Sequence, residues 1–345
     1  MKTSILPDAH DDRSAARVAL EPKPRARLSY TPGVWDRFPS KLTVVDEAPE
    51  PLRSSMREKL PPPDRTHLLV FGPANRTSGR RSAATLLAVT DTGWLLASGA
   101  EDGDVRVTQC DFANTLLLEL TSILLHGRLK IDFAVAGRAH FVTAEFNTVM
   151  DEYYREAVQL LLDGMDGIGA AARGDGKETC ARLASLPMKF HNAVLHFAPS
   201  GQRPRDFLHW PAVIRGKYRW LQFELAPEAL LARTDRELVF ISEEKPWSWF
   251  RAKPPAKYGN IVTYFPLSRL VNCELGERGM LDTVELAVRA PHGGEKFKID
   301  FPRERKNEVA AFIGRVMRRP VTATADTAGF TQPLTDMDTT SGRIE

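Results

Sequence analysis

Short runs of apolar residues recur along most of the chain and are separated by clusters of turn-forming residues. From residue 64 the pattern predicts seven strands: Thr66–Phe71, Ala84–Val89, Trp94–Ser98, Val105–Gln109, Leu116–Leu120, Arg128–Ala134 and Ala139–Thr143. Short strands at this spacing are typical of an all-β barrel or sandwich. A helix from Asn147 to Leu162 is predicted next, because Asn147 is a good N-cap and the apolar residues after it fall at helical spacing.

The same succession is predicted again in the second half of the chain. A short lead-in helix, Met188–Phe197, precedes strands at Asp206–Trp210, Ala229–Arg233, Leu238–Ser242, Asn260–Pro266, Leu270–Glu274, Thr283–Ala290 and Lys296–Asp300. A helix from Pro302 to Arg319 follows, since proline is tolerated in a first helical turn. One apolar stripe on this helix predicts that it packs against its own barrel; the stripe consists of Val309, Phe312, Ile313, Val316 and Met317.

An internal repeat explains why the two halves look alike. The phrase Leu86-Leu-Ala-Val-Thr-Asp-Thr-Gly-Trp-Leu-Leu-Ala-Ser98 returns 144 positions later as Leu230-Leu-Ala-Arg-Thr-Asp-Arg-Glu-Leu-Val-Phe-Ile-Ser242, with six of thirteen positions identical. Each copy is predicted to form two strands joined by a tight turn. Gly72-Pro-Ala74 likewise matches Trp210-Pro-Ala212, and Phe146-Asn147 matches Phe301-Pro302. The sequence therefore predicts a duplicated domain.

Composition sets the limits of the predicted domains. Residues 1–63 hold ten of the 24 prolines, which predicts a mostly disordered or extended segment, with Tyr30, Trp35 and Phe38 as side chains for docking on a domain surface. Residues 64–163 form the first domain, 164–187 a glycine-containing linker and 188–319 the second domain. Residues 320–345, with seven threonines, are predicted to be a disordered tail.

Charge and cysteine content exclude several classes of protein. A net charge of +3 is too small to favour nucleic acid as a partner. The three cysteines, Cys110, Cys180 and Cys273, fit neither a disulfide framework nor a zinc motif and favour a reducing compartment. No apolar run is long enough to span a membrane, and the first ten residues lack a signal peptide's apolar run. We therefore expect a cytoplasmic protein without a transmembrane segment.

Seven antiparallel strands followed by one amphipathic helix, twice in one chain, resemble the pleckstrin-homology-like (PH-like) fold, and its bacterial domains in particular. The phrase Leu-Leu-Ala-x-Thr-Asp in strands two and three carries the resemblance, which covers about residues 64–163 and 188–319. It implies a mainly β protein of two barrels, each closed at one end by its C-terminal helix. It also implies that the loops after strands one and three meet at the other end. Members bind lipids, phosphorylated peptides or proteins, so the fold leaves the ligand open.

In the second repeat these two loops are basic and aromatic, whereas in the first repeat the loop Gly99–Asp104 is short and acidic. The basic residues suit phosphate groups; they are Arg215, Lys217, Arg219, Arg251, Lys253 and Lys257. The aromatic residues suit a membrane interface; they are Trp247, Trp249 and Phe250. The alternative is that the same loops pack against protein, either within the chain or on a partner, and we weigh this interpretation above the lipid one. Only the second repeat is predicted to carry the ligand or partner loop.

Other candidate sites have simpler explanations. Asp91 and Asp235 recur in the repeated turn, where aspartate usually caps its own backbone. His191, His196 and His209, with Asp206, lack the spacing of a helix-borne metal pair, so no metal is predicted. Residues 174–179 resemble a phosphate-binding loop only superficially, because Glu178 stands where Ser or Thr is needed. No cofactor is predicted.

The sequence is interpreted as a non-enzymatic binding or assembly module that mediates protein–protein contacts. The first alternative is a peripheral membrane adaptor that binds anionic lipid headgroups at the inner membrane face. The second is an enzyme with an active site between the two domains, which would need convergent polar groups in a cleft.

Overall fold

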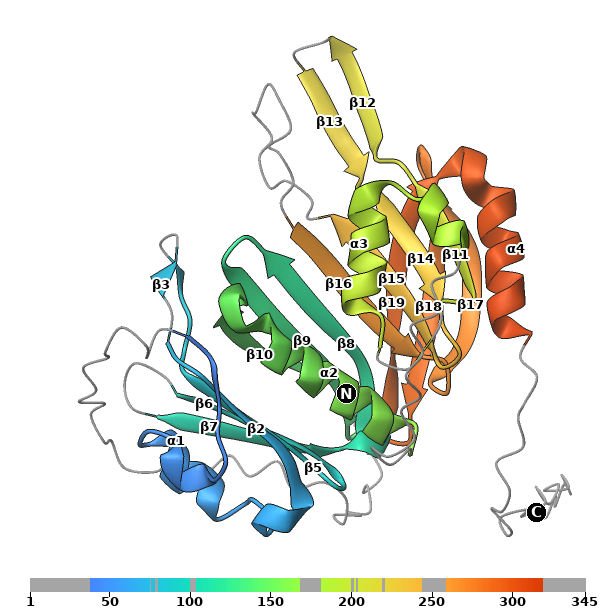
Figure 1. The fold of residues 1–345 in the computed structure, drawn as a ribbon. Helices are drawn as coiled ribbons and strands as arrows, with labels where there is room; N and C mark the ends of the chain where they lie inside the picture. Colours follow the sequence, from blue (N-terminus) through green and yellow to red (C-terminus); the bar gives the residue numbers. More distant parts are fainter. Residues whose placement is uncertain are drawn as a thin grey trace, which may run out of the picture.

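The computed structural model describes residues 38–74, 76–77, 80–99, 104–167, 181–199, 202, 204–218, 221–243 and 259–318. This part of the chain is mainly β, with antiparallel strand pairs throughout and four α-helices (Figure 1). The predicted mainly β class is confirmed. The sheets do not close into barrels, however, and the physical reason is a pairing between the two halves, described below.

The first half begins with a five-stranded sheet in the order β1-β2-β5-β6-β7. Its strands are β1 (Ser40–Lys41), β2 (Thr66–Gly72), β5 (Thr85–Thr90), β6 (Gly93–Gly99) and β7 (Val105–Asp111). A small hairpin of β3 (Arg76–Thr77) and β4 (Arg80–Arg81) joins β2 to β5. Three further strands then form a meander: β8 (Thr115–Ile123), β9 (His126–Val135) and β10 (Arg138–Asn147). The helix α2 (Asp151–Met165) ends this half.

The second half repeats this order. Its first four strands are β11 (Asp206–Trp210), β14 (Ala229–Arg233), β15 (Glu237–Glu243) and β16 (Gly259–Pro266). A hairpin of β12 (Val213–Tyr218) and β13 (Leu221–Ala226) joins β11 to β14, at the place of β3–β4 in the first half. The last three strands form a separate sheet of β17 (Leu270–Arg278), β18 (Leu281–Ala290) and β19 (Gly293–Pro302). The helix α4 (Lys306–Met317) follows.

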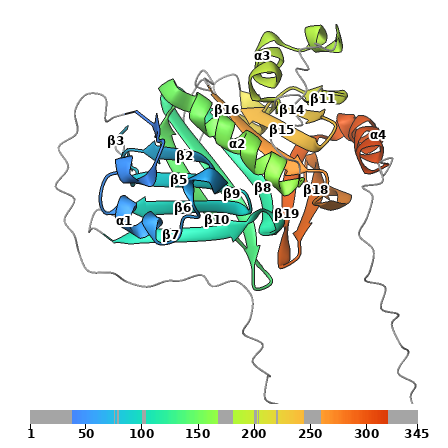
Figure 2. The same ribbon diagram turned by 60° about the horizontal axis from the view of Figure 1, so that its bottom comes forward.

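One strand pairing joins the two halves into a continuous sheet. β16 of the second half pairs with β8 of the first, so that seven strands run in the order β10-β9-β8-β16-β15-β14-β11. The edge of β8 that a closed barrel would turn toward its own half is therefore bonded to the other half. Helix α2 lies between the five-stranded sheet and this seven-stranded sheet (Figures 1 and 2).

The two halves share their registers as well as their strand order. In the first hairpin Leu86 pairs with Ala97, and in the second Leu230 pairs with Ile241, 144 positions later in both strands. The last three strands are offset by 155 positions: the β8–β9 pair Ile123–His126 corresponds to the β17–β18 pair Arg278–Leu281. The β8–β9 pairing shifts its register after Thr115, and the β17–β18 pairing shifts its register at the equivalent position, after Leu270. The repeated phrases therefore mark equivalent positions in space.

Both C-terminal helices form where the apolar stripes predicted them. Asn147 accepts a hydrogen bond from the backbone N–H of Val149 and begins a 3₁₀ turn, Thr148–Met150, that leads into α2. The corresponding turn before α4 is Arg303–Arg305. The predicted helix Pro302–Arg319 thus begins one short turn later than expected. Val309, Phe312, Ile313 and Val316 are buried in one cluster with the second half's sheets, whereas Met317 is exposed.

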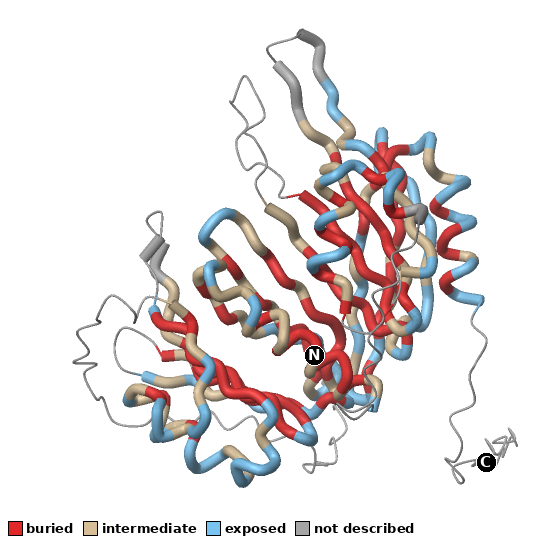
Figure 3. Tube along the Cα trace, in the orientation of Figure 1, coloured by how far each residue is buried: buried red, intermediate tan, exposed pale blue. Residues whose placement is uncertain are grey.

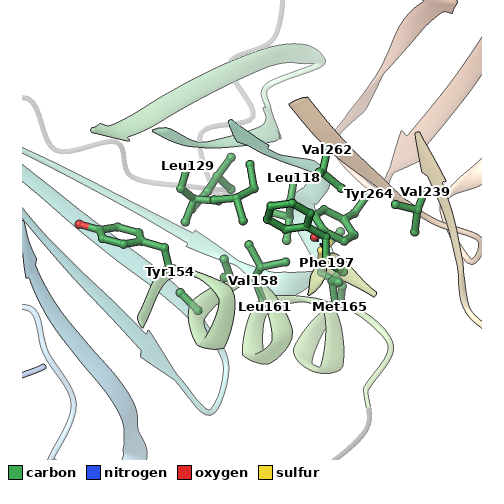
Figure 4. Packing of buried hydrophobic residues seen from close by; sticks show 14 of the residues in the cluster. Leu118, Leu129, Tyr154, Val158, Leu161, Met165, Phe197, Val239, Val262 and Tyr264 are labelled. Carbon is green, nitrogen blue, oxygen red and sulfur yellow. Dashed lines mark hydrogen bonds between the residues drawn. The ribbon is translucent and has the colours of Figure 1, made fainter. Parts of the chain in front are cut away.

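A short helix covers the outer face of the first sheet in each half. Helix α3 (Met188–Phe197), as predicted, lies on one face of β14–β16, and one side of it is buried (Figure 3). Its Phe190 and Phe197 belong to the cluster that also contains α2, and Figure 4 shows Phe197 with Val158 and Met165 of α2. Helix α1 (Leu52–Arg57) covers the matching face of β5 and β6 with Leu52 and Met56.

The packing of α1 differs from the expectation that residues 1–63 form mostly a tail. Residues 38–63 are folded against the sheet, since the outer face of β5 and β6 is as apolar as the inner one.

Of the three aromatic residues expected to dock, Tyr30 and Trp35 lie outside the described residues. Residues 320–345, the predicted C-terminal tail, also lie outside the described residues. Between α2 and α3 a 3₁₀ turn, Ala181–Ser185, precedes Leu186, and the rest of the predicted linker is described only as far as residue 167.

The repeat also exchanges a large residue for a small one at equivalent core positions. In the first half Gly72 ends β2 beside Tyr154 of α2. In the second half Trp210 ends β11, and Val309 holds the position of Tyr154 in α4. All three large or branched side chains, Tyr154, Trp210 and Val309, are fully buried. The space between the first long strand and the C-terminal helix is therefore filled by the helix residue Tyr154 in the first half and by the strand residue Trp210 in the second.

We expect Gly72→Ala to lower the free energy of unfolding by about 1–3 kcal/mol, the usual cost of overpacking a core. A Cβ at this position would lie 2.5 Å from the Tyr154 hydroxyl and 2.8 Å from Thr85 Oγ1. Adding Tyr154→Phe should recover part of the loss. Gly276→Ala in β17 is the control, because its Cβ would meet no atom within 4 Å. Equal urea midpoints for wild type and Gly72→Ala would show that the core is looser than described.

Candidate functional site

Two long connections leave the seven-stranded sheet at the same end. Trp210, the last residue of β11, pairs with Ala229, the first of β14, and the β12–β13 hairpin lies between them. Glu243, the last residue of β15, pairs with Asn260 of β16, and residues 244–258 connect these two strands. The β12–β13 hairpin projects beyond the sheet in Figure 1. The described residues thus place the starts and ends of both predicted loops at one end of the molecule.

The structure describes only part of the predicted binding set. Arg215 is exposed on β12, and Lys217 belongs to the same strand, without a described side chain. Arg219, Trp247, Trp249, Phe250, Arg251, Lys253 and Lys257 lie outside the described residues. The basic and aromatic rim that these residues would form therefore stays a prediction.

Exposed apolar side chains lie around the same end of the sheet, and sequence reasoning missed most of them. Each is more than half exposed; they are Leu124 and Leu125 in the β8–β9 turn, Val149 before α2, Met188 at the start of α3, and Ile214 in β12. We call this set the hairpin end. The sequence indicates only one part of this set: Leu124 and Leu125 continue an apolar strand into the turn at His126-Gly127.

Hydrogen bonds and one ion pair fix the elements of the hairpin end. The backbone N–H of Thr148 donates to the carbonyl of Leu125 at 3.3 Å, and the Thr148 hydroxyl donates to the carbonyl of Leu124. Ile123, just before this turn, pairs with Gly259 at the start of β16. Lys189 of α3 forms an ion pair with Glu243 at the end of β15. These contacts hold Leu124, Leu125 and Val149 next to one another while the three side chains remain exposed.

A shallow cleft of about 230 Å³ lies between α2 and α3, where the two halves meet. It is lined by Glu152, Arg155, Glu156, Val158, Gln159, His196, Phe197, Ala198, Pro199 and Tyr264. Three of its lining residues form ion pairs: Glu156 pairs with Lys41 at 2.8 Å, and His196 and Arg155 pair with Asp151 at 3.1 Å and 3.3 Å. The Tyr264 hydroxyl donates to the carbonyl of Phe197 at 2.8 Å. Of these contacts, the His196–Asp151 ion pair joins α3 of the second half to α2 of the first.

The recurring aspartates have a structural role that differs from the expected one. Asp91 accepts from Arg65 at 2.9 Å and pairs with His67, while Asp235 accepts from Arg205 at 2.6 Å. Arg65 stands just before β2, and Arg205 stands just before β11. The neighbouring threonines cap the backbone of the turn instead. The Thr90 hydroxyl accepts a hydrogen bond from the N–H of Gly93, and the Thr234 hydroxyl accepts one from the N–H of Glu237. The expectation that aspartate caps its own backbone was wrong.

The histidines near Asp206 do not come together. His196 pairs with Asp151, His209 with Glu228 at 2.8 Å, and Asp206 with Arg315 at 2.7 Å. Among the described residues no group of three or more His, Cys, Asp or Glu side chains could hold a metal ion.

The sequence matches no known protein family and no curated protein. None of the helices in the described ranges is long and apolar enough to cross a membrane.

Proposed function

We propose that the protein is a binding module of two PH-like units that contacts a protein partner through the hairpin end. One observation carries this proposal: Leu124, Leu125 and Val149 are exposed next to one another through the bonds of Thr148 to the β8–β9 turn, and Met188 and Ile214 are exposed at the same end of the sheet. Soluble proteins rarely leave clustered apolar surface uncovered unless it binds something. Leu124, Leu125 and Val149 would form the apolar centre, with Arg215 and Lys189 at the polar rim.

The assignment of each half to a PH-like unit is part of this proposal. It is supported by the repeated order of four strands, three strands and a helix, and by the hairpin that follows the first strand in both halves. The β8–β16 pairing fixes the two units relative to one another, because backbone hydrogen bonds cross the junction along six residue pairs. Such a frame presents a binding surface without a large ordering cost.

A membrane-binding role is the second candidate, and exposed Arg215 beside exposed Ile214 on β12 favours it. Together with Lys217, Arg219, Arg251, Lys253, Lys257 and the aromatic residues Trp247, Trp249 and Phe250, they would bind anionic headgroups and insert into the interface. The proposed protein contact and this alternative make opposite predictions for vesicles.

The test compares Leu125→Ser with Phe141→Ser. Both side chains are more than half exposed, but Phe141 lies on β10, six residues from Asn147 at the hairpin end. A photo-crosslinking residue at position 125, and not at position 141, should trap a protein partner in cells. Leu125→Ser should then weaken binding of that purified partner at least about tenfold, which corresponds to about 1.4 kcal/mol. Phe141→Ser should bind like wild type.

Vesicle sedimentation separates the alternatives. Wild-type protein that sediments with anionic vesicles, and less so at higher salt, would support the membrane role. Crosslinks at neither position, together with no vesicle binding, would contradict both proposals for the hairpin end.

A further inference from the structure

The junction between the two halves is a strand pairing that the repeat makes available a second time. In the junction, Val262 of β16 pairs with Leu120 of β8, and Tyr264 pairs with Leu118. Counted from β2 and from β11, and without the inserted hairpins, β8 is the fifth strand of the first half and β16 is the fourth strand of the second. The equivalent fifth strand of the second half is β17, and the equivalent fourth strand of the first half is β7. Among the described strands, β7 and β17 each have a partner on one side only.

The equivalence holds residue by residue. β6 and β7 pair Ser98 with Arg106, and β15 and β16 pair Ser242 with Ile261, so that β7 maps onto β16 with an offset of 155 positions. β8 maps onto β17 with the same offset. Helix α4 lies against β17 as α2 lies against β8, where it does not prevent the pairing with β16.

We propose that β17 of one copy of this protein pairs with β7 of a second copy, in the antiparallel register of the β8–β16 junction. An unpaired edge strand presents backbone N–H and C=O groups that another chain can bond. The junction register sets the partners: Leu275 opposite Val107, Cys273 opposite Gln109, and Arg278 opposite Asp104.

Burial supports the pairing from the β17 side. In β8 Leu118 and Leu120, which pair with Tyr264 and Val262 of β16, are at most 1% exposed. Leu275 of β17, the equivalent of Leu120, is 39% exposed although it is still apolar. An added strand would cover Leu275 with Val107, as Val262 covers Leu120 in the junction.

Charge supports the same register. Arg278 bonds Asp300 at 3.0 Å and is 70% exposed, and its guanidinium has further donors for a carboxylate of a second copy. Arg106, exposed on β7, would lie opposite Gly276 and diagonal to Glu274, a spacing within reach of long side chains. Arg106 is equally diagonal to Arg278, so the register brings together two attractive contacts, Arg278–Asp104 and Arg106–Glu274, and one like-charge diagonal that Asp104 offsets.

A contact between two different edges is heterologous, so it extends the assembly instead of closing it as a dimer. Copies joined in this way form a ring or an open filament, depending on the rotation between them. The strands involved are separate from the hairpin end, so this proposal and the proposed partner contact can fail independently.

The natural Cys273 allows a direct test of the register. Gln109→Cys would place a second thiol opposite Cys273, and copper-phenanthroline oxidation should then give a ladder of covalent oligomers on non-reducing gels. Arg106→Cys is the matched control, since residue 106 lies opposite Gly276 in this register. Adding Cys273→Ser to Gln109→Cys should abolish the ladder. A ladder of equal strength from Arg106→Cys, or none from Gln109→Cys, would overturn the proposed pairing.

The head-to-tail polarity is tested by blocking one edge at a time. Leu275→Lys blocks β17 and Gln109→Lys blocks β7, both at exposed or half-exposed sites where lysine should leave the fold intact. In sedimentation velocity, wild type should gain mass with concentration, and each variant alone should associate at least about tenfold more weakly. An equimolar mixture should form a one-to-one dimer and nothing larger. A monomeric wild type at every concentration, or association blocked by only one variant, would refute the proposal.

Discussion

Replacing Phe312 with alanine is expected to lower the free energy of unfolding by about 3–5 kcal/mol, the range for truncating a fully buried phenylalanine. Phe312 is 1% exposed and lies in the cluster that also contains Trp210 of β11 and Phe301 of β19. Its removal would leave a cavity between α4 and two different sheets, and packed strands on both sides cannot collapse to fill it. Urea titration followed by tryptophan fluorescence measures the loss.

Met317→Ala is the control for this prediction, because Met317 is on the same helix and 39% exposed. Alanine is the best helix former, so the change should cost little. A loss below about 1 kcal/mol for Phe312→Ala would mean that α4 is not held by its own sheets, since only exposed sites tolerate such truncation.

The apolar patterns predicted the helices and hairpins because those elements carry their own signal. Val309, Phe312, Ile313 and Val316 recur at helical spacing, and all four are buried on one side of α4. The repeated hairpin phrase alternates sides, so that Leu87 faces the core with α2 while Leu86 faces α1. Periodicity of this kind is local, and one sequence is enough to detect it.

The junction between β8 and β16 has no such signal. Strand pairing depends on backbone groups that every residue carries, so the identity of Leu118 or Val262 does not indicate which strand it pairs with. The prediction of two closed barrels failed there: the edge of β8 is bonded to the other half. Helix α1 was missed for a related reason, because two buried residues, Leu52 and Met56, are too few to stand out in a proline-rich segment.

The hairpin end could be predicted only in part. Loop positions followed from strand order, and the basic character of residues 215–219 was visible in the sequence. The apolar centre was not, because Leu124 and Leu125 come together with Val149 only through the bonds of Thr148 to the β8–β9 turn. Sites assembled from distant segments require the tertiary structure.

A second prediction concerns pH and arises from Glu237, which stands in the repeated turn where the first half has Gly93. Its side chain is 1% exposed and accepts hydrogen bonds from Gln202 at 2.7 Å and from the Thr234 hydroxyl at 2.6 Å. Burial raises the pKa of Glu237 from 4.5 to about 7, against the lowering effect of the Thr234 and Gln202 hydrogen bonds. The folded protein therefore holds this proton more tightly than the unfolded chain does.

The sign of the pH dependence follows from this difference in pKa. Below pH 4.5 both states hold the proton and the stabilising contribution is complete; it is lost as pH rises through about 7, where the folded state must bury a carboxylate. A shift of this size corresponds to about 3 kcal/mol at about 1.4 kcal/mol per pKa unit. Asp132, whose pKa burial raises to about 6, adds its own loss over a lower range. Comparison with a variant isolates Glu237.

Glu237→Gln mimics the neutral form, because its amide oxygen can still accept from Gln202 and its amide nitrogen can donate to the Thr234 hydroxyl oxygen. The variant should match wild type near pH 4.5 and be more stable by about 2–3 kcal/mol at pH 8, in urea titrations repeated across this range. Glu304→Gln, at an exposed position, controls for the change in net charge and should show no such divergence. If the wild-type and Glu237→Gln curves instead run parallel from pH 4.5 to 8, Glu237 is ionised in the folded protein throughout. Its hydrogen bonds would then outweigh its burial, and the turn would tolerate a carboxylate where the first half has glycine.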